Sequence, residues 1–286
     1  MRFDVAIVGG GSGGFGAAWA AARLGLRVVI VDRHHRLGGL STVGGVSCWE
    51  PGVGATGAPL DLYRLLRQTP GQVAIYSVGR HFAWPTPSSM EGREWVERGE
   101  TDGWAECRRR IRAHWHYLQA EHPEFRRYRF WSEALLMGIR ETRQISCHRI
   151  LSEDDLRGGL SRQRDPDVIA LADHPLDRHG QGGGCHLLNE PYGIPFRSLI
   201  PVGSENMAVA CRAAGFDAAA ASSVRLSRTV MQMGQAVGTA AALAAQKRRA
   251  LTDVDAGSLR EALRRQGVAL EWPPPPAIQQ RIAEAG

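Results

Sequence analysis

The sequence predicts an α/β fold organised around a central parallel sheet. Three observations lead to this prediction: an apolar run at residues 3–8, the glycine pattern G-x-G-x-x-G directly after it, and an alanine-rich helical segment that leads to a second apolar run ending at Asp32. Strand, glycine turn, helix and strand in this order are typical of a Rossmann-like unit that binds a dinucleotide. The alternative, a glycine-rich turn without a ligand, would require all of these features to coincide by chance.

The three glycines of the pattern, Gly9, Gly11 and Gly14, have different predicted roles. One glycine allows the tight turn, the next lets backbone N–H groups approach a pyrophosphate, and the third lets the helix and the strand pack closely. The helix then presents its positive end to the phosphates. Asp32 is expected to accept hydrogen bonds from a ribose 2′-hydroxyl, and its negative charge disfavours a 2′-phosphate there.

The rest of the first half is less regular. Residues 33–61 form a glycine-rich stretch, which we expect to be a functional loop that approaches a bound ligand. A short amphipathic helix is predicted at Leu60–Leu66 and a strand at Val73–Val78. Residues 79–103 are polar and rich in Pro, Gly and Ser, which indicates a linker or surface crossing, and an amphipathic helix is expected over residues 103–121.

The second half of the chain is predicted to complete the nucleotide-binding fold with further short strands and helices. The expected strands lie within Leu135–Ile150, at Asp167–Ala172 and at Asn206–Cys211, and the expected helices lie at Ser152–Leu156, within Val224–Gln246 and over residues 256–267. The helix within Val224–Gln246 is rich in glycine and alanine, so it permits very close packing or close approach of a cofactor.

Composition argues against several classes of protein. The chain of 286 residues is 43% hydrophobic and 22% charged, as in an ordinary soluble protein. Its net charge is +6, but the arginines are spread along the chain, and the densest cluster, Arg108–Arg112, falls on the polar side of a predicted helix. We therefore expect a solvated helix face rather than nucleic-acid binding. The five cysteines are scattered and the histidines fit no familiar ligand spacing, so we expect neither a disulfide framework nor a metal site.

The location is expected to be cytoplasmic, without membrane association. The first predicted strand starts at residue 3, which leaves no room for a signal peptide in front of it. No apolar run approaches the ~18–20 residues that a membrane span needs.

Several further motifs follow the glycine pattern in a fixed order. They are LGG at Leu37–Gly39, a T-x-x-x-V-x-x-W stretch from Thr42 to Trp49, GIRETR at Gly138–Arg143, PLDRH at Pro175–His179, YGIPFRSLIP at Tyr192–Pro201, ENMAVACRAAG at Glu205–Gly215 and SVRLSRTVMQMGQAVGTAAALA at Ser223–Ala244. In these motifs, which cover well over half of the chain, the sequence resembles FAD-dependent oxidoreductases of the glutathione-reductase-like class, and in particular a bacterial subfamily of that class.

The resemblance implies a Rossmann-like FAD-binding fold that holds FAD non-covalently. It implies that Gly9, Gly11, Ser12 and Gly14 hold the pyrophosphate, that Asp32 binds the adenosine ribose with Arg33 flanking the adenine side, and that Gly38, Gly39, Leu40 and Ser41 run beside the ribityl chain and the flavin ring. It also implies that Arg212 closes a strand returning to the cofactor, and that Gly234, Gln235 and Ala236 lie beside the pyrimidine half. A helix starting at Gly234 would stabilise negative charge on the reduced flavin, and tight helix packing alone is the alternative.

The chain departs from this resemblance in its middle. Members of the class usually carry a substrate domain, whereas the interval 66–135 is short here, so the second region is reduced. We therefore assign residues 1–78 to the N-terminal part of the FAD-binding domain, 79–190 to a shortened linker or substrate region, and 191–286 to the C-terminal part that completes the FAD-binding domain. The short middle predicts exposed apolar surface near the flavin, which a second copy or a partner chain would cover.

Few side chains are candidates for contact with a substrate. His179 could act as an acid or base, because its reference pKa is near neutrality, or could be structural. Arg197 and Arg225 could each hold a carboxylate or phosphate oxygen, or could pair with an acidic side chain. Glu141 and Arg143 lie two residues apart in a predicted strand, hence on one face, and a structural ion pair is expected between them.

The activity implied by the resemblance is that of an FAD-dependent oxidoreductase, which transfers a hydride between a small organic substrate and flavin N5. The alternative is a shortened, non-catalytic subunit that binds FAD or another nucleotide or serves in assembly. A protein that uses NAD without flavin is a third reading, which the C-terminal motifs disfavour. The region that would select the substrate is the short one.

Overall fold

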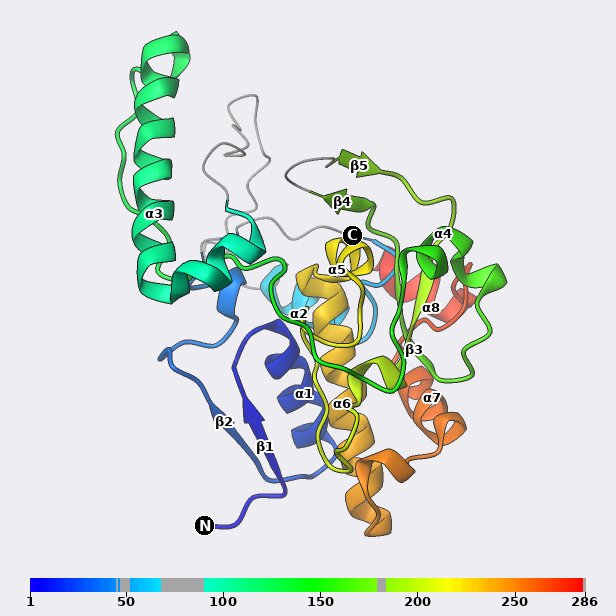
Figure 1. Ribbon diagram of the computed structural model, residues 1–286. Coiled ribbons are helices and arrows are strands. Elements are labelled where there is room, and N and C mark those ends of the chain that lie inside the picture. Colours follow the sequence, from blue (N-terminus) through cyan, green and yellow to red (C-terminus); the bar gives the residue numbers. More distant parts are fainter. Residues whose placement is uncertain (45, 47–51, 68–89, 179–183, 285–286) are drawn as a thin grey trace.

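The computed structural model describes residues 1–44, 46, 52–67, 90–178 and 184–284, and helices and strands are mixed along this part of the chain (Figure 1). The chain therefore has a mixed α/β fold, as the sequence predicts. The predicted strand at Val73–Val78 lies outside the described residues.

The amino-terminal unit has the predicted order of strand, helix and strand. It consists of β1 (Val5–Val8), α1 (Ser12–Arg23) and β2 (Val28–Val31). The two strands pair in parallel over their whole length, with Val5 opposite Val28 and Val8 opposite Val31. A helical crossover between two parallel strands is what the sequence pattern requires.

The expected central parallel sheet is reduced to this one pair among the described residues, where the strands form three separate two-stranded sheets. β3 (Val168–Ala172) pairs antiparallel with β6 (Tyr192–Pro195), and β4 (Leu176–Arg178) pairs antiparallel with β5 (Gly184–His186). The strands of the second half thus satisfy their backbone hydrogen bonds with one another and do not extend the sheet of β1 and β2.

Two regions predicted to contain strands form no ladder. Within Leu135–Ile150 most side chains are exposed, and the nearest regular contact is an isolated bridge from Cys147 to Pro201. Asn206–Cys211 contains no strand, although the Val209 N–H donates to the Leu199 carbonyl at 2.8 Å. Both predictions were wrong because alternation of apolar residues indicates a strand only where a neighbouring strand offers an edge.

α3 (Gly92–Glu121) is longer than predicted and projects away from the body of the molecule (Figure 1). It begins well before residue 103, so the linker prediction is wrong for these turns. Ion pairs four residues apart, such as Arg93 with Glu97 at 2.8 Å, support the early turns even without a continuous apolar stripe. Gly99, at φ 79°, interrupts the helical backbone.

The arginine cluster of α3 is tied to acids of the same arm. Arg109 and Arg110 both pair with Glu106, at 2.8 and 2.7 Å, and Arg112 pairs with Glu133 at 3.0 Å. These contacts are those of a charged, solvated helix face, as the spacing predicts.

α6 (Ser227–Lys247) packs along α1 (Figure 1) with the two backbones in direct contact. A Cβ added at Gly234 would lie 2.0 Å from the Gly13 carbonyl oxygen, and one added at Gly238 would lie 2.3 Å from the Ala17 carbonyl oxygen. Glycine is required at both positions because any side chain would push the helices apart.

The remaining elements surround this helix pair. They are η1 (Gly39–Ser41), α2 (Ala58–Arg67), η3 (Pro123–Phe125), α4 (Glu153–Arg162), η4 (Phe196–Leu199), α5 (Ala218–Val224), η5 (Leu251–Asp253), α7 (Ala256–Arg265) and α8 (Pro276–Ala283). The predicted cap at Ser152 is confirmed, since its hydroxyl accepts from the Asp155 N–H and the Asp155 carboxylate accepts from the Ser152 N–H. No helix in the described part of the chain is long and apolar enough to span a membrane.

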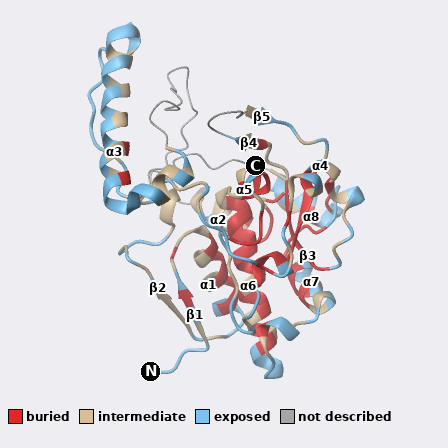
Figure 2. Ribbon diagram, in the orientation of Figure 1, coloured by how far each residue is buried: buried red, intermediate tan, exposed pale blue. Residues whose placement is uncertain are grey.

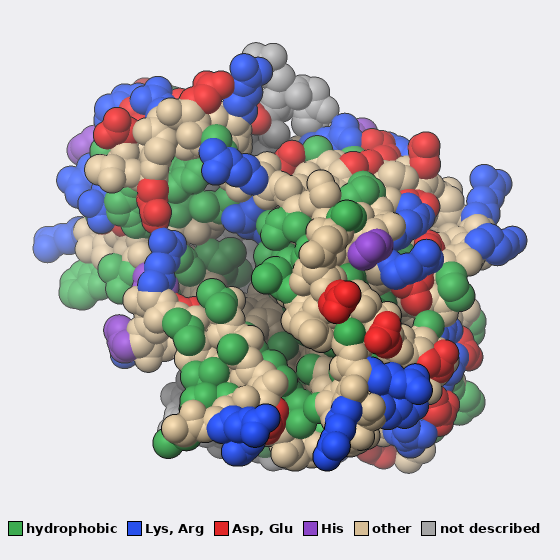
Figure 3. Space-filling view, turned by 60° about the horizontal axis from the view of Figure 1, so that its bottom comes forward, with side chains coloured by type: hydrophobic (Ala, Val, Ile, Leu, Met, Phe, Trp, Pro, Cys, Tyr) green, Lys and Arg blue, Asp and Glu red, His purple; other side chains and the backbone are tan. Residues whose placement is uncertain are grey.

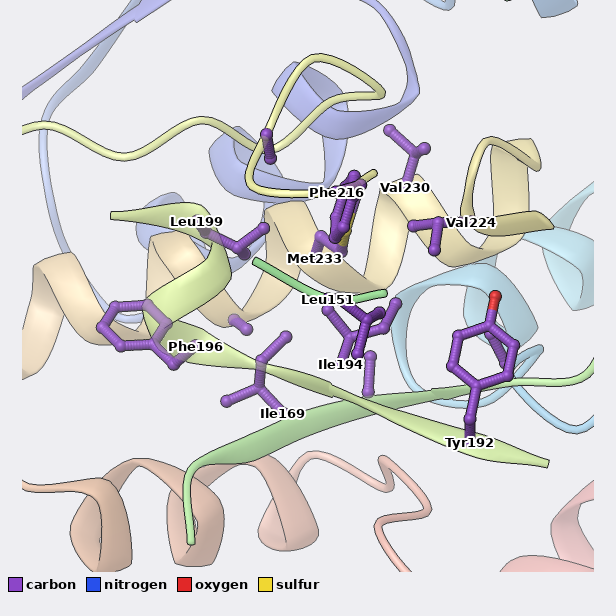
Figure 4. Close-up of a cluster of buried hydrophobic side chains, with 14 of the residues drawn as sticks. Leu151, Ile169, Tyr192, Ile194, Phe196, Leu199, Phe216, Val224, Val230 and Met233 are labelled. Carbon is purple, nitrogen blue, oxygen red and sulfur yellow. The ribbon is translucent and has the colours of Figure 1, made fainter. Parts of the chain in front are cut away.

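The hydrophobic core lies between α6 and the β3–β6 pair (Figures 2 and 4). Ile169, Ile194 and Met233 are fully buried there. The Tyr192 hydroxyl forms a hydrogen bond of 2.6 Å with Ser223, and burial raises the pKa of Tyr192 well above its ordinary range. This core fixes α6, and α6 in turn fixes α1.

The sheet of β1 and β2 is covered on one face only. Ile7 is buried on the side of the helices, whereas Val8 is 88% and Val31 56% exposed. These two valines are register partners, so their side chains lie on the same uncovered face. Figure 3 shows the molecule with the bottom of Figure 1 brought forward, and on this side hydrophobic side chains gather around a hollow.

Candidate FAD site

The glycine turn between β1 and α1 forms an open cradle. Gly9 has φ +96°, a conformation that permits the tight turn, and a Cβ added at Gly11 would meet no atom within 4 Å. A Cβ added at Gly14 would lie only 1.8 Å from the Gly9 carbonyl oxygen, so this glycine permits close packing. The geometry therefore agrees with the three roles that the pattern predicts, and the space in front of Gly11 is free for a ligand.

The first turn of α1 is suited to an anion. Its N-cap residue, Gly11, offers no side-chain hydrogen bond, and no acidic residue lies in the turn that begins at Ser12. Backbone N–H groups at this end consequently keep their donors for an external partner.

Asp32 lies at the end of β2 and is held against the cradle. Its carboxylate accepts hydrogen bonds from the backbone N–H groups of Gly10 at 2.5 Å and of His34 at 2.6 Å. These two bonds lower the pKa of Asp32, so the side chain is ionised at neutral pH. The next residue, Arg33, pairs with Glu100 of α3 at 2.9 Å.

The segment expected beside the ribityl chain reaches the same place. The Gly38 N–H donates to the Gly10 carbonyl at 2.7 Å, and a Cβ added at Gly39 would lie 3.0 Å from the Cα of Gly11. At its far end the Ser41 hydroxyl is 3.0 Å from the hydroxyl of Ser227, the first residue of α6. Leu40 follows Gly39 in η1 and is partly buried. Three segments that are distant in sequence therefore meet at the cradle.

The first turns of α6 carry buried polar atoms without a hydrogen-bond partner among the described residues: Nε and Nη1 of Arg228, the hydroxyl of Thr229 and Oε1 of Gln232. The Arg228 side chain is only 4% exposed and lies 2.8 Å from the carboxylate of Asp173 without hydrogen-bond alignment. A Cβ added at Gly52 would lie 2.5 Å from its guanidinium carbon, so the glycine-rich loop packs directly on this group. Buried polar atoms without partners are rare in folded proteins, and a water molecule, an ion or a polar ligand can satisfy them.

Comparison with known families decides what kind of ligand this is. The model of the family of FAD dependent oxidoreductases matches residues 4–91 and 60–263. The chain belongs to this family. FAD is therefore the cofactor of this FAD-dependent oxidoreductase, and its function is a flavin-linked redox function. No solved structure matches the chain.

The described residues of the oxidoreductase fit this cofactor. The open cradle at Gly11 and the uncapped start of α1 suit a pyrophosphate, and the carboxylate of Asp32 suits a ribose hydroxyl. Arg228 at the start of α6 is ion-paired with Asp173, and its Nε and Nη1 have donors without an aligned acceptor among the described residues. Sequence reasoning missed Arg228, although an arginine inside a run of small and apolar helical residues is itself a signal of a buried charge.

Gly234, Gln235 and Ala236 lie inside α6 and are buried. The predicted helix within Val224–Gln246 is present as α6, and because it starts at Ser227, the condition of a helix start at Gly234 is not met. Gly234 contacts α1, and the Gln235 side chain accepts a hydrogen bond of 2.8 Å from the Ala58 N–H. These contacts are the ones expected if the small residues serve tight helix packing, which was the alternative to a cofactor turn.

Arg212 also lies away from any strand, in contrast to the prediction. Its guanidinium is 3.4 Å from the hydroxyl of Thr142, and burial lowers the pKa of Arg212. A buried guanidinium of this kind is a candidate for an anionic partner.

The structure does not bring the predicted substrate-contact residues together. His179 lies outside the described residues. Arg225 donates to Asp177 in β4 at 2.6 Å, whereas Arg197 donates to Asp167, the residue before β3, at 3.1 Å. Both arginines therefore form the ion pairs that the sequence left open as the alternative.

The prediction of an ion pair between Glu141 and Arg143 was also wrong. No strand covers these residues, and no such pair occurs in the part of the chain that the structure describes. Glu141 instead lines a cavity beside the start of α3.

Proposed function

We propose that the protein is a flavoprotein of the glutathione-reductase-like class that holds FAD non-covalently in an extended form and transfers a hydride between a small organic substrate and flavin N5. The observation that carries this proposal is the meeting of three segments at one cradle. Gly10 accepts from Gly38, and Ser41 contacts Ser227, so the turn, the LGG segment and the start of α6 line a continuous path.

In this proposal each segment binds a different part of the cofactor. The N–H groups that follow Gly9, Gly11, Ser12 and Gly14 bind the pyrophosphate, and Asp32 binds the adenosine ribose. Residues 38–41 lie along the ribityl chain. Arg228 and the free N–H groups of the first turn of α6 face the end of the cofactor that carries negative charge when reduced.

FAD supplies the redox chemistry when bound, and the chain supplies position and electrostatics. The ionised Asp32 orients the adenosine end. The buried cation at Arg228 stabilises negative charge more strongly than an exposed one, because little water screens it. Arg225 and His179 remain predicted contacts to the substrate.

A non-catalytic binding or assembly subunit is the second candidate, and the middle of the chain favours it. Between α2 and α4 the described residues form the projecting helix α3, the short η3 and surface segments, and they form no second sheet. A substrate domain of the usual size is therefore not found in this part.

The absorption spectrum of the purified protein tests the proposal. We expect bands near ~370 and ~450 nm from bound flavin, released as intact FAD on denaturation because it is not covalently attached. A protein that stays colourless after incubation with FAD would contradict it. Anaerobic bleaching by a candidate substrate separates the enzyme from the binding subunit, since a subunit without catalysis keeps its oxidised spectrum.

A second copy or a partner chain is proposed to cover the exposed face of β1 and β2. The exposed side chains of Val8, Val31 and Leu37 support this, because they lie beside the cradle. Sedimentation of the FAD-loaded protein tests it, and a monodisperse monomer at micromolar concentration would count against a stable homodimer. We also propose that the protein is located in the cytoplasm.

A further inference from the structure

A cavity of about 460 Å³ lies between the start of α3, the segment from Met137 to Thr142, the strand β4 and the start of α5. None of its lining residues belongs to the cradle, but two of them contact arginines outside the cavity. Asp177 in its wall binds Arg225, and Thr142 in its wall contacts Arg212. Its volume falls within the range of sites for small organic ligands, roughly 300–1,000 Å³.

One wall of the cavity is apolar and firmly held. Trp95 and Ile111 of α3 lie opposite Ile139. The break at Gly99 folds the first turns of α3 back, so that the ring of Trp95 packs on Gly103, where an added Cβ would lie 2.6 Å from the ring. An aromatic ring fixed in this way offers a flat surface for the apolar body of a ligand.

The arginines that line the cavity are already engaged with carboxylates, although Arg140 shares Asp177 with Arg225. Arg140 donates to Asp177 at 2.5 Å, and Arg178 donates to Glu153 at 2.5 Å. Asp177 also accepts from Arg225. An anionic ligand would have to compete with these carboxylates for the guanidinium donors.

Two carboxylates of the lining, those of Glu91 and Glu141, differ from Asp177, because within the described part of the molecule no ion pair or hydrogen bond engages their side chains. Glu141 lines the cavity and is exposed to solvent. Packing around it raises the pKa of Glu141, and the negative charges of Glu91 and Asp217 raise it further, against the opposing effect of Arg178. A cation placed here would relieve repulsion among three carboxylates.

We infer that this cavity binds an organic amine in its ammonium form, with the nitrogen at Glu141 and the apolar body against Trp95 and Ile111. The ammonium group supplies the donors and the positive charge that Glu141 lacks. This preference for a cation comes from the carboxylate of Glu141. The chain as a whole carries a net charge of +6 and repels cations at long range. That this amine is also the substrate rests on the proposed function, whereas its binding does not.

Titration calorimetry on the full-length protein, with and without FAD, tests the inference with three probes of similar shape. They are 2-phenylethylamine, the neutral 2-phenylethanol and the anionic 3-phenylpropionate. We expect the amine to bind at least tenfold more tightly than the alcohol and the carboxylate to bind weakest. Equal affinity for amine and alcohol would overturn the assignment.

Two substitutions measure separately what Glu141 and the apolar wall contribute to the affinity of the amine. Glu141→Gln keeps the size of an exposed side chain, so the fold is retained, and it should weaken the amine at least tenfold while leaving the alcohol unchanged. Trp95→Ala should weaken both probes. The matched control is Glu261→Gln on α7, which pairs with Arg265 at 3.2 Å and should change neither. Unchanged amine affinity in Glu141→Gln would refute the inference.

The two proposals fail in distinguishable ways. If the FAD-free protein binds the amine in a manner that depends on Glu141, but bound flavin is not bleached by it, the cavity assignment stands and the amine is not the substrate. If the protein carries FAD but shows no preference for the amine, the cavity inference fails and the flavin proposal is unaffected.

Discussion

At the scale of single residues, the surroundings of the fingerprint glycines distinguish a ligand site from a packing site. Gly11 faces open space and has an ordinary φ of −67°. Gly14 and Gly13 face backbone, since an added Cβ would lie 1.8 Å from a carbonyl oxygen at either position. A new methyl group also has room at Gly9, but the φ of +96° there strains any residue with a side chain, so Gly11 is the fingerprint glycine at which alanine fits both the space and the backbone.

Gly11→Ala should therefore fold normally and lose FAD. We expect a free energy of unfolding within about 1 kcal/mol of the wild type, because alanine adopts this backbone conformation, and FAD affinity reduced at least ~tenfold, because the methyl group occupies the space the pyrophosphate needs. Chemical denaturation of the apoprotein and equilibrium dialysis with FAD measure the two effects.

Gly14→Ala is the matched comparison. The added methyl group collides with the Gly9 carbonyl, so we expect a loss of about 3 kcal/mol or more of folding stability in the apoprotein. If Gly14→Ala were as stable as Gly11→Ala, the description of the turn would be wrong.

Asp32 makes a pH-dependent contribution to stability. Its pKa in the folded protein is lowered, first by the hydrogen bond from the Gly10 N–H and then by that from the His34 N–H. A carboxyl whose folded pKa is below its unfolded value stabilises the fold fully above the unfolded value, and this contribution is lost as the pH falls through the folded pKa. Asp32→Ala should cost about 2 kcal/mol at neutral pH, and the difference from the wild type should shrink below about pH 4. Urea denaturation at several pH values measures it, and a difference independent of pH would contradict it.

At the scale of elements, the contact between α1 and α6 holds the site together. Two glycines of α6, Gly234 and Gly238, face the α1 backbone. The small-residue motif therefore sets the distance between the two helices whose amino-terminal turns are proposed to bind FAD.

Gly234→Ala should weaken this contact. The new Cβ would lie 2.0 Å from the Gly13 carbonyl, so the helices must separate, and we expect a loss of about 1–3 kcal/mol together with weaker FAD retention. Gly158→Ala in α4 is the control, since its nearest neighbour would be at 3.6 Å and alanine there should add up to about 1 kcal/mol. If the two variants were equally stable, the helices would be able to separate at Gly234 without a cost in folding free energy, and the prediction would be wrong.

At the scale of the whole molecule, the cradle joins segments from both ends of the chain. The turn at Gly9–Gly14 and the LGG segment come from the first 41 residues, and the start of α6 follows near residue 227. A ligand bound at this place stabilises all three segments at once.

Hydrogen exchange should show this coupling. On adding FAD we expect slower amide exchange in residues 9–14, in 38–41 and in the first turn of α6, with little change in α7, which lies apart from the cradle. Protection confined to residues 9–14 would contradict a site built from three segments.

The sequence predicted the first unit well because its signals are local. The alternation of strand and helix up to Asp32 and the cap at Ser152 depend on neighbouring residues, and both are present. Predictions that needed a distant partner were less accurate. Asn206–Cys211 has the composition of a strand but no neighbouring edge, and Gly234 has the composition of a cofactor turn but lies inside a helix.

The sequence by itself determined that this chain has a dinucleotide-binding unit, because a glycine turn and an acidic strand end are local patterns. The fixed order of motifs indicated FAD through their resemblance to a family, which the family match supports. The tertiary structure alone decided which residues share a place. It buried Arg228 at the start of α6, assigned Gly234 to packing against α1 and placed Glu141 at a cavity. The physical reason is that burial and charge pairing arise between segments far apart in the chain, so no local pattern records them.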